Sequence, residues 1–331
     1  MDGPRYPQLV GDIGGTNARF AWIESPGAAP SDVRAYAAAE YPSLIEAMRH
    51  YLREAGKPVP PWCAIGIANP VTGDHVKMTN HDWSFSISAL RRELGLERFL
   101  VLNDFTALAL ALPGLGPQDL RQLGGAPPVP QAPLGLVGPG TGLGVSGLLP
   151  AAPGRPPIPL TGEGGHVTLA PADDHEARIV DQLRQRFGHA SAERAVSGPG
   201  LVNLYQAVCT LQEVAPRPLD AADISLAAVR GDDAQCVEAL ELMCSFLGNV
   251  AGNLALTVGA RGGVYIGGGI VPKLGDWFER SKFRSRFEDK GRFRSYLQPV
   301  PVFVVHARHP ALSGAAYALQ VLPPGSDPGD D

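Results

Sequence analysis

A glycine-rich turn near the N-terminus combines residue types that can bind phosphate. Residues 11–17 read Gly-Asp-Ile-Gly-Gly-Thr-Asn and are followed by a strand-like run at 18–23. Glycines allow a tight turn whose backbone N–H groups form a concave nest for phosphate oxygens. Asp12 adds a carboxylate where a phosphate-bound Mg²⁺ would sit. The stretch lacks the lysine of a Walker A loop, and it also fits an ordinary β-hairpin turn.

A second glycine-rich stretch has the same arrangement. Residues 138–144 read Gly-Pro-Gly-Thr-Gly-Leu-Gly between two strand-like runs, so they predict a second turn that could hold phosphate from the other side. Residues 142–147 also fit the G-x-G-x-x-G pattern of dinucleotide sites. Such a site needs a helix directly afterwards, whereas 148–159 holds five prolines. The pattern therefore favours a phosphate turn over a dinucleotide site.

Asn103 and Asp104 lie at a boundary where α/β proteins often bind ligands. A buried strand is predicted at 99–102 and a helix at 105–112, so both residues follow the carboxyl end of a strand. A carboxylate at a helix N-terminus is favoured in its anionic form, which suits a base at neutral pH. Asn and Asp are also common helix N-caps, so a purely structural role is the alternative.

Two further segments carry polar side chains beside glycines. Glu163 and His166 flank a Gly-Gly pair, and they favour hydrogen bonding over metal binding because no other Cys or His lies at ligand spacing. Glu193 precedes the Ser-Gly-Pro-Gly loop at 197–200, which leads into a predicted helix. The alternative for Glu193 is a surface ion pair with Arg194.

Strand and helix signals alternate along the chain and predict an α/β protein with a mixed sheet in each half. The predicted strands are 9–13, 18–23, 33–38, 62–68, 99–102, 134–138, 142–149, 263–266 and 300–305. One helix is predicted to begin after Ser43. The other predicted helices cover 86–94, 105–112, 173–187, 200–211, 221–229, 233–258 and 311–320. Residues 113–133 are expected to form a loop or hinge, and 150–159 a Pro-rich surface excursion.

Bulk composition excludes several classes of partner. The 331 residues are 44% hydrophobic and 18% charged with a net charge of −5, which argues against nucleic acid. The basic run at 280–294 is interrupted by acids and predicts a solvated helix face. The four cysteines are far apart, so we expect buried free thiols in a reducing compartment. We see neither a signal peptide nor an apolar run of about 18–20 residues, so no membrane contact and a cytoplasmic location are expected.

These segments together resemble the bacterial glucokinase family outside the ROK kinases, within the sugar kinase, Hsp70 and actin superfamily. The resemblance covers roughly residues 8–320. Its anchors are GDIGGTNAR (11–19), IANPVTGDHVKMTNHDWSFS (67–86), LNDFTALALALP (102–113), GPGTGLGV (138–145), GEGGHVTLAP (162–171), SAERAVSGPGLVNLY (191–205) and GGVYIGGGIVPKL (262–274). The cysteine motif that binds zinc in ROK kinases is missing from these segments, so we expect no structural zinc.

The resemblance implies roles for particular positions. The residues matching the family's ATP site are Gly11, Asp12, Ile13, Gly14, Gly15, Thr16, Gly140, Thr141, Gly142, Gly268 and Gly269. Asp12 would lie near Mg²⁺ and hold it through water. The residues matching its glucose contacts are Asn103, Asp104, Glu163, His166 and Glu193, with Asp104 as the catalytic base. Residues 80–82 are expected only in the neighbourhood of the sugar.

The implied activity is ATP-dependent phosphorylation of glucose at its 6-hydroxyl, giving glucose 6-phosphate and ADP in the first step of glycolysis. ATP and Mg²⁺ are the expected cofactors, and a homodimer is the expected assembly. A kinase for another hexose, such as mannose or fructose, remains the alternative. A sugar-sensing regulator of the same fold fits less well, because only about eight residues precede the first strand and a DNA-binding module needs more.

The resemblance also implies two α/β domains of the actin-like ATPase, ribonuclease H-like type flanking a central cleft. The smaller domain would comprise residues 1–113 and 307–322, and the larger domain 114–306. A disordered tail is expected at 323–331, which is acidic and rich in proline and glycine.

Overall fold

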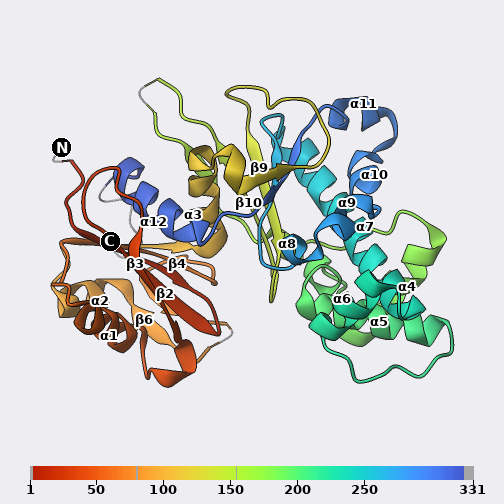
Figure 1. Cartoon of the computed structure of the whole chain (residues 1–331), viewed down its shortest axis with the longest axis horizontal. Coiled ribbons are helices and arrows are strands. Elements are labelled where there is room, and N and C mark those ends of the chain that lie inside the picture. The colour runs from red at the N-terminus through yellow and green to blue at the C-terminus, as the bar shows by residue number, and fades with distance from the viewer. Residues whose placement is uncertain (1–2, 80, 154, 324–331) are drawn as a thin grey trace. The chain divides into compact units, whose positions relative to one another are not determined.

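The computed structural model describes residues 3–79, 81–153 and 155–323, and the chain divides into two compact units (Figure 1). Unit 1 takes the chain as far as Leu115, the segment Ala151–Thr161 and the part from Ala307 onward. Unit 2 takes Gly116–Pro150 and Gly162–His306. The segment 151–161 therefore counts with unit 1, whereas the sequence placed it in the larger domain. Apart from Pro323, the tail predicted at 323–331 lies outside the described residues.

Unit 1 is built on a mixed sheet with strand order β3-β2-β1-β4-β7. The antiparallel pairs are β1–β2 and β2–β3, and the parallel pairs are β1–β4 and β4–β7. The strands are β1 (Gln8–Ile13), β2 (Asn17–Ile23), β3 (Ser31–Ala37), β4 (Trp62–Ile67) and β7 (Arg98–Asn103), with a separate hairpin of β5 (His75–Lys77) and β6 (Ser84–Ser86). The five predicted strands of this half are confirmed, and the β5–β6 hairpin was not predicted.

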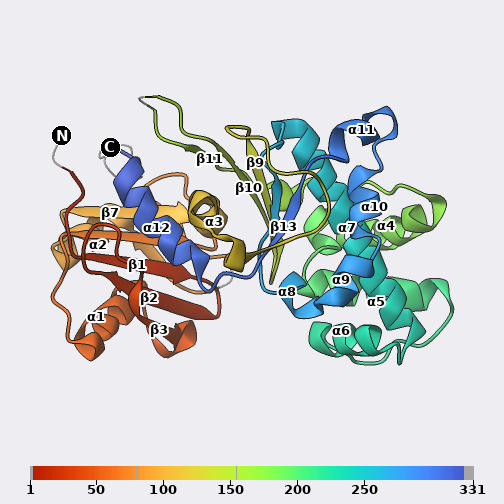
Figure 2. The same ribbon diagram turned by 45° about the horizontal axis from the view of Figure 1, so that its top comes forward.

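Helices cover both faces of this sheet. The helices α1 (Leu44–Ala55) and α2 (Ile87–Leu94) lie on one face, and α3 (Asp104–Ala111) and α12 (Pro310–Val321) lie on the other (Figures 1 and 2). Apolar residues of α1 and α2 form one buried core with the sheet. The start of α1 follows from Ser43, whose side chain accepts a hydrogen bond from the N–H of Glu46.

The last described helix is held tightly to the first part of the chain. A Cβ built at Gly314 of α12 would overlap the carbonyl oxygen of Ala107 in α3, so the two helices touch backbone to backbone. At the other end of α12, the buried Arg98 of β7 donates hydrogen bonds to the carbonyls of Leu319 and Leu322, at 3.3 and 3.1 Å. The position of α3 therefore depends on α12.

Unit 2 carries a second mixed sheet, whose strands run in the order β10-β9-β12-β13-β8. The pairs β9–β12 and β12–β13 are parallel, and β9–β10 and β13–β8 are antiparallel. The strands are β8 (Leu120–Gln122), β9 (Leu134–Pro139), β10 (Leu143–Leu149), β12 (Val264–Ile266) and β13 (Val302–Val305). The short strand β11 (Ile158–Leu160) belongs to the segment that counts with unit 1.

The helices of unit 2 are α4 (Asp174–Phe187), α5 (Gly198–Leu211), α6 (Ala221–Arg230), α7 (Ala234–Val258), α8 (Val271–Leu274), α9 (Asp276–Arg280), α10 (Phe283–Glu288) and α11 (Arg294–Leu297). Short 3₁₀ turns complete the chain at η1 (Ala38–Glu40), η2 (Leu112–Gly114), η3 (Pro117–Asp119), η4 (Gly164–His166), η5 (Ala192–Arg194) and η6 (Gly291–Phe293). The predicted helices over α4 to α7 are confirmed, while α8 to α11 were not resolved individually by the sequence.

The helix α7 forms the centre of the second core. It packs against α5, α6 and α10. By length and composition α7 is apolar enough to cross a membrane, which the sequence analysis did not predict. In the structure, 72% of the most apolar 18-residue segment of α7 is buried inside the protein, as in a core helix. Its apolar surface is therefore used by its own neighbours.

Two expectations about local structure were wrong in part. The segment 113–133 was predicted as loop or hinge, and the two units do divide after Leu115, but β8 within the segment pairs with β13 at the edge of the sheet. The basic run at 280–294 was predicted as a solvated face. The side chains of Arg284 and Arg286 are instead only 16% exposed and form ion pairs with Glu288 and Glu176. Burial with a paired acid satisfies the charge of each arginine.

All four cysteines are buried, as predicted, and none forms a disulfide. Burial raises the pKa of the Cys63 and Cys244 thiols well above the usual range, and that of Cys236 to about 12. Because the thiolate is the reactive form, these cysteines are expected to be inert in the folded protein.

We predict that an aromatic disulfide reagent such as DTNB at pH 8 labels none of the four cysteines in the native protein and all of them after unfolding. The reason is their burial and raised pKa. The released thionitrobenzoate, read by absorbance, measures the labelling. Rapid release of one equivalent from native protein would show that at least one thiol is accessible.

We predict that Gly314→Ala lowers the stability of unit 1 by about 2 kcal/mol, because a methyl group there collides with the backbone of α3. Helix propensity alone predicts the opposite sign, since alanine favours a helix interior over glycine by about 1 kcal/mol. Urea denaturation followed by circular dichroism measures the shift. Gly114→Ala, whose Cβ has nothing within 4 Å, is the matched control and should leave the midpoint unchanged.

Candidate active site

In unit 1, the predicted phosphate turn and the start of α3 lie at the same edge of the sheet. The parallel register aligns Ile13 of β1 with Ile67 of β4, and Ile67 with Asn103 of β7. Neighbouring strands are spaced by about 4.8 Å, and β4 alone lies between β1 and β7, so the turn and Asn103 are roughly 10 Å apart. A Cβ at Gly66 in the intervening strand would be 3.3 Å from the Asp104 Cα, which shows how closely α3 begins over the sheet.

The first glycine turn is a β-hairpin turn and also keeps donors available. The N–H of Gly14 donates to the carbonyl of Asn17 at 2.9 Å and closes the turn between β1 and β2. Within the described part of the chain, the N–H groups of Gly15 and Thr16 have no hydrogen-bond partner, and Thr16 is exposed. The two alternatives for this turn are therefore compatible: a hairpin turn can present two N–H groups and one hydroxyl to a phosphate.

Asp12 is paired with a residue that the sequence did not single out. The Arg19 guanidinium of β2 donates to Asp12 Oδ2 at 2.8 Å, and both side chains are largely buried. Burial raises the pKa of the Asp12 carboxyl, while the charge and hydrogen bond of Arg19 lower it. His309, at the start of α12, is close enough for Asp12 and Arg19 to act on its charge, and burial lowers the pKa of this imidazole.

The donor set around Asp12 is compatible with a phosphate-bound Mg²⁺. Mg²⁺ is commonly held by one or two carboxylates together with substrate phosphates and water. Arg19 occupies Oδ2 of Asp12, whereas Oδ1 has no hydrogen-bond partner among the described residues. No cluster of three or more His, Cys, Asp and Glu side chains suited to a metal occurs in the described ranges.

Asn103 and Asp104 occupy the first turn of α3. Asn103 Oδ1 accepts from the N–H groups of Phe105 and Thr106 at 2.9 and 3.2 Å, so Asn103 is the N-cap. The N–H of Phe105 also donates to Asp104 Oδ1 at 2.9 Å, which favours the charged carboxylate at this end of the helix. Asn103 therefore has a structural role as a cap, and its amide Nδ2 also makes a long contact of 3.5 Å to the carbonyl of Asn69.

Asn69, which Asn103 contacts, also connects to the segment around residues 80–82. Asn69 Oδ1 accepts from the N–H and the hydroxyl of Thr79, which fixes the approach to this segment. Asn80 lies outside the described residues. His81 uses Nδ1 to accept from the N–H of Trp83 and packs edge-on against that ring.

In unit 2, the second glycine turn joins β9 and β10. The N–H of Gly140 donates to the carbonyl of Gly142 at 2.8 Å, and Pro139 faces Leu143 in the strand pair. The N–H groups of Thr141 and Gly142 have no hydrogen-bond partner in the ranges that the structure describes, and Thr141 is exposed. This turn therefore presents the same set of donors as the first one, two N–H groups and a threonine hydroxyl.

Gly268, in the loop that follows β12, lies against the same turn. Its φ of +76° is in the left-handed region, and a Cβ there would overlap the carbonyl oxygen of Pro139. The N–H of Gly267 donates to the carbonyl of Val137 at 2.9 Å and keeps the loop at the sheet edge. Gly269 faces open space. Glycine at 268 is thus required by backbone geometry as well as by close packing.

Of the predicted sugar-binding residues of unit 2, Glu193 contacts the second turn, and Glu163 and His166 belong to a segment that packs on β10. The 3₁₀ turn η4 packs on β10, where a Cβ at Gly165 would overlap the carbonyl oxygen of Leu143. Glu163 and His166, at either end of that glycine pair, are exposed. Glu193 does not form the alternative surface ion pair: its Oε2 accepts from the N–H of Leu143 at 2.9 Å.

Sequence reasoning missed Arg19, Asn69 and His309. Arg19 belongs to the motif at 11–19 but was treated only as part of a strand. His309 has a left-handed φ of 53°, unusual for a residue with a side chain and a common sign of a functional position. The His-Pro pair at 309–310, before a predicted helix, was the one local signal available.

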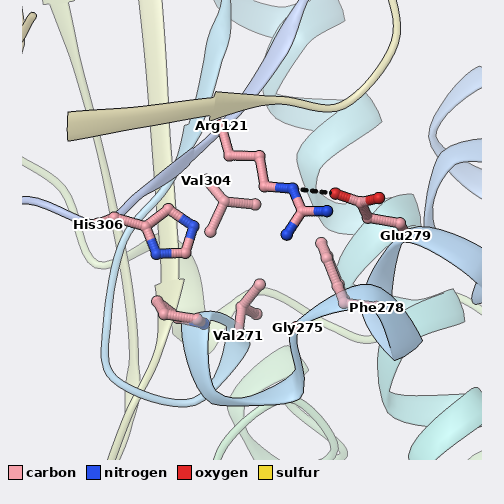
Figure 3. Close-up of a pocket in the computed structure, with 8 residues that line it drawn as sticks. Arg121, Val271, Gly275, Phe278, Glu279, Val304 and His306 are labelled. Atoms are coloured by element: carbon pink, nitrogen blue, oxygen red, sulfur yellow. Dashed lines mark ion pairs between the residues drawn. The ribbon is translucent and has the colours of Figure 1, made fainter. Parts of the chain in front are cut away.

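A shallow pocket in unit 2 contains none of the predicted site residues (Figure 3). It lies between the β8–β13 edge and the short helices α8 and α9, where the Arg121 guanidinium pairs with Glu279. Its lining comprises Arg121, Val271, Pro272, Gly275, Phe278, Glu279, Val304 and His306. The internal ion pair already satisfies both charges, so this pocket does not compete with the glycine turns as a candidate active site.

Comparison with known proteins shows which family the chain is similar to. The sequence model of the Glucokinase family matches residues 9–322. A glucokinase of Aromatoleum aromaticum is 56% identical over 315 residues, which is 95% of this chain and 95% of the relative. A glucokinase of Chromobacterium violaceum is 53% identical over 324 residues, covering 98% of this chain and 92% of the relative.

A solved structure agrees with these relatives. The crystal structure of a glucokinase from an Antarctic psychrotroph has a TM-score of 0.84 to this chain at 36% identity, and covers 95% of this chain and 98% of that one. The fold is accordingly that of the actin-like sugar kinases, as predicted. Because the family model and the relatives agree over nearly the whole chain, the protein belongs to the glucokinase family.

Proposed function

We propose that Asp104 is the general base with which this enzyme, an ATP-dependent glucokinase by family, phosphorylates the 6-hydroxyl of glucose. The observation that supports this role is the alignment of strand ends in unit 1, which holds Asp104 at the same sheet edge as the first glycine turn. The reacting sugar oxygen must lie about 2.6–3.2 Å from the base and about 3–3.5 Å from the phosphorus, so the base and the phosphate site have to share one edge of the sheet.

In the proposed reaction, the Asp104 carboxylate accepts the proton of the sugar hydroxyl as that oxygen bonds to the γ-phosphorus of ATP, and ADP leaves. Phosphoryl transfer depends mainly on positioning and on neutralising phosphate charge. The helix N-terminus at α3 keeps the carboxylate charged, and the hydrogen bond from Phe105 fixes one of its oxygens. The result is a fixed base that needs no covalent intermediate.

We assign the ATP phosphates to the two glycine turns. In unit 1 the donors are the N–H groups of Gly15 and Thr16, and in unit 2 those of Thr141 and Gly142, each set with a threonine hydroxyl beside it. Gly11, Ile13 and Gly14 shape the first turn, Gly140 closes the second, and Gly268 and Gly269 leave room for the adenosine. Asp12 would hold Mg²⁺, through water, which supplies charge neutralisation to the phosphates when bound.

We assign the sugar hydroxyls to Asn103 and Asp104 of unit 1 and to Glu163, His166 and Glu193 of unit 2. Carboxylate, imidazole and amide groups give directional acceptors and donors, and a missing or inverted hydroxyl would leave one of them unpaired. This arrangement supports glucose as the preferred hexose. A kinase for mannose or fructose would need the same residues to accept an altered ring.

We further propose a homodimer in the cytoplasm, with the smaller domain formed by 1–113 and 307–322 and the larger by 114–306. The resemblance to the bacterial glucokinase family implies this assembly. Four buried free thiols suit a reducing compartment.

We predict that Asp104→Asn lowers kcat for glucose by about 10²–10⁴-fold, the usual contribution of a general base, while glucose binding remains measurable. The amide keeps the size of the carboxylate but cannot take the proton. A coupled assay with glucose 6-phosphate dehydrogenase measures turnover, and titration calorimetry measures glucose binding. Asp232→Asn, on an exposed loop before α7, is the matched control and should retain full activity. Substantial turnover in Asp104→Asn would rule out the assigned role.

We predict that kcat/KM for glucose exceeds that for mannose, fructose and N-acetylglucosamine by about 10- to 100-fold, since one polar group left without its hydroxyl costs about 1–3 kcal/mol. The same assay format, with ADP release as the readout, allows all four sugars to be compared with ATP. A higher kcat/KM for mannose or fructose would support the alternative hexose kinase.

A further inference from the structure

The Glu193 carboxylate lies directly against the second glycine turn. Its Oε2 accepts a 2.9 Å hydrogen bond from the N–H of Leu143, the residue where the turn enters β10. A Cβ at Gly142 would overlap the same Oε2 atom, so glycine at that position is what allows the carboxylate to approach. A predicted sugar ligand thus contacts the predicted phosphate turn within one unit.

The backbone of Glu193 is fixed from the other side. The hydroxyl of Ser197, which is fully buried, donates to the carbonyl of Glu193 at 2.8 Å and accepts from the N–H of Gly200 at 2.9 Å as the N-cap of α5. The next residue along, Gly198, donates its N–H to the carbonyl of Gly140 at 2.8 Å. The start of α5 therefore holds the turn at two points, by a backbone bond and by the Glu193 side chain.

The contacts from α5 and Glu193 determine which N–H groups of the turn remain available to a ligand. The N–H of Gly140 is used within the turn, and the N–H of Leu143 is used by Glu193. The N–H groups of Thr141 and Gly142 then face outward without a partner among the described residues. If the Leu143 bond were lost, a buried N–H would lack an acceptor and the turn would reorganise to satisfy it.

One oxygen of the Glu193 carboxylate remains available for a ligand. Oε2 is committed to Leu143, whereas Oε1 of Glu193 has no hydrogen-bond partner in the part of the chain that the structure describes. A sugar hydroxyl can donate to Oε1 while Oε2 keeps its bond to the turn. Sugar binding would then immobilise the same side chain that orders the phosphate turn.

We propose that Glu193 is a positioning residue of the second phosphate turn and couples sugar binding to nucleotide binding. The inference rests on the proposed function, because it takes Glu193 as a sugar contact and the turn as a phosphate site. Coupling of this kind is reciprocal: glucose strengthens nucleotide binding by the same factor as the nucleotide strengthens glucose binding.

The test measures ADP binding by titration calorimetry in Mg²⁺, without and with saturating glucose. Without glucose, Glu193→Ala is expected to weaken ADP binding by about fivefold or more, since it leaves the Leu143 N–H unpaired. Glu193→Gln keeps an acceptor oxygen and is expected to restore most of the affinity. In the native protein glucose tightens ADP binding several-fold, and this effect is lost in Glu193→Ala.

The matched control is Asp232→Ala, which removes a carboxylate of unit 2 on the exposed loop before α7, away from the turn. It should bind ADP as the native protein does when glucose is absent. Native ADP affinity in Glu193→Ala, tighter binding through loss of a negative charge, or an equal loss in Asp232→Ala would each overturn the proposal. Thermal melting of each variant checks folding, and Glu193→Gln keeps the test decisive if Glu193→Ala does not fold. The proposed function fails separately, through the Asp104 assay, because ADP binding without glucose needs no turnover.

Discussion

The parallel pairing of β1, β4 and β7 in a common register is the constraint on which the candidate site of unit 1 depends. It brings the ends of the three strands to one edge, so that the end of β1 and Asn103 lie roughly 10 Å apart across β4 although they are far apart in the chain. Small residues are then needed wherever a helix must approach this edge. Gly66 makes room for the start of α3, and Gly314 makes room for α12 behind it.

In unit 2, a different set of contacts holds the glycine turn in place. The second glycine turn is held by the start of α5, by Gly268 from the loop that follows β12, and by the Glu193 carboxylate. In both units the turn uses some of its N–H groups for its own closure and leaves two consecutive ones to face outward. A phosphate-binding turn therefore requires neighbours that take up the remaining donors and acceptors.

Much of this architecture could be predicted from the sequence, because strands and helices with strong periodicity are local features. Ser43, Asn103 and the glycines after strands identified element boundaries correctly. Short elements could not be found in this way: β8 has three residues in a Pro- and Gly-rich stretch, and α10 has six in a basic run. The burial of Arg284 and Arg286 depends on acids brought close by folding, which charge patterning does not show.

The candidate site was predictable as a set of residues but not as a set of contacts. Motif order pointed to Asp12, Asp104 and Glu193. It gave no sign that Asp12 is paired with Arg19 or that Glu193 bonds to Leu143, since the second contact joins residues 50 positions apart. Such contacts depend on strand pairing and helix placement, which a single sequence leaves open.

The place of α12 in the fold has a consequence for synthesis of the chain. It packs on β1 and β4 and is anchored by Arg98, yet it is made after all of unit 2. While the ribosome is still producing unit 2, the strands of unit 1 lack the helix that covers one of their faces. Unit 2 is nearly continuous in sequence and can close its core first. The unit whose synthesis begins first is therefore the one that completes its folding last.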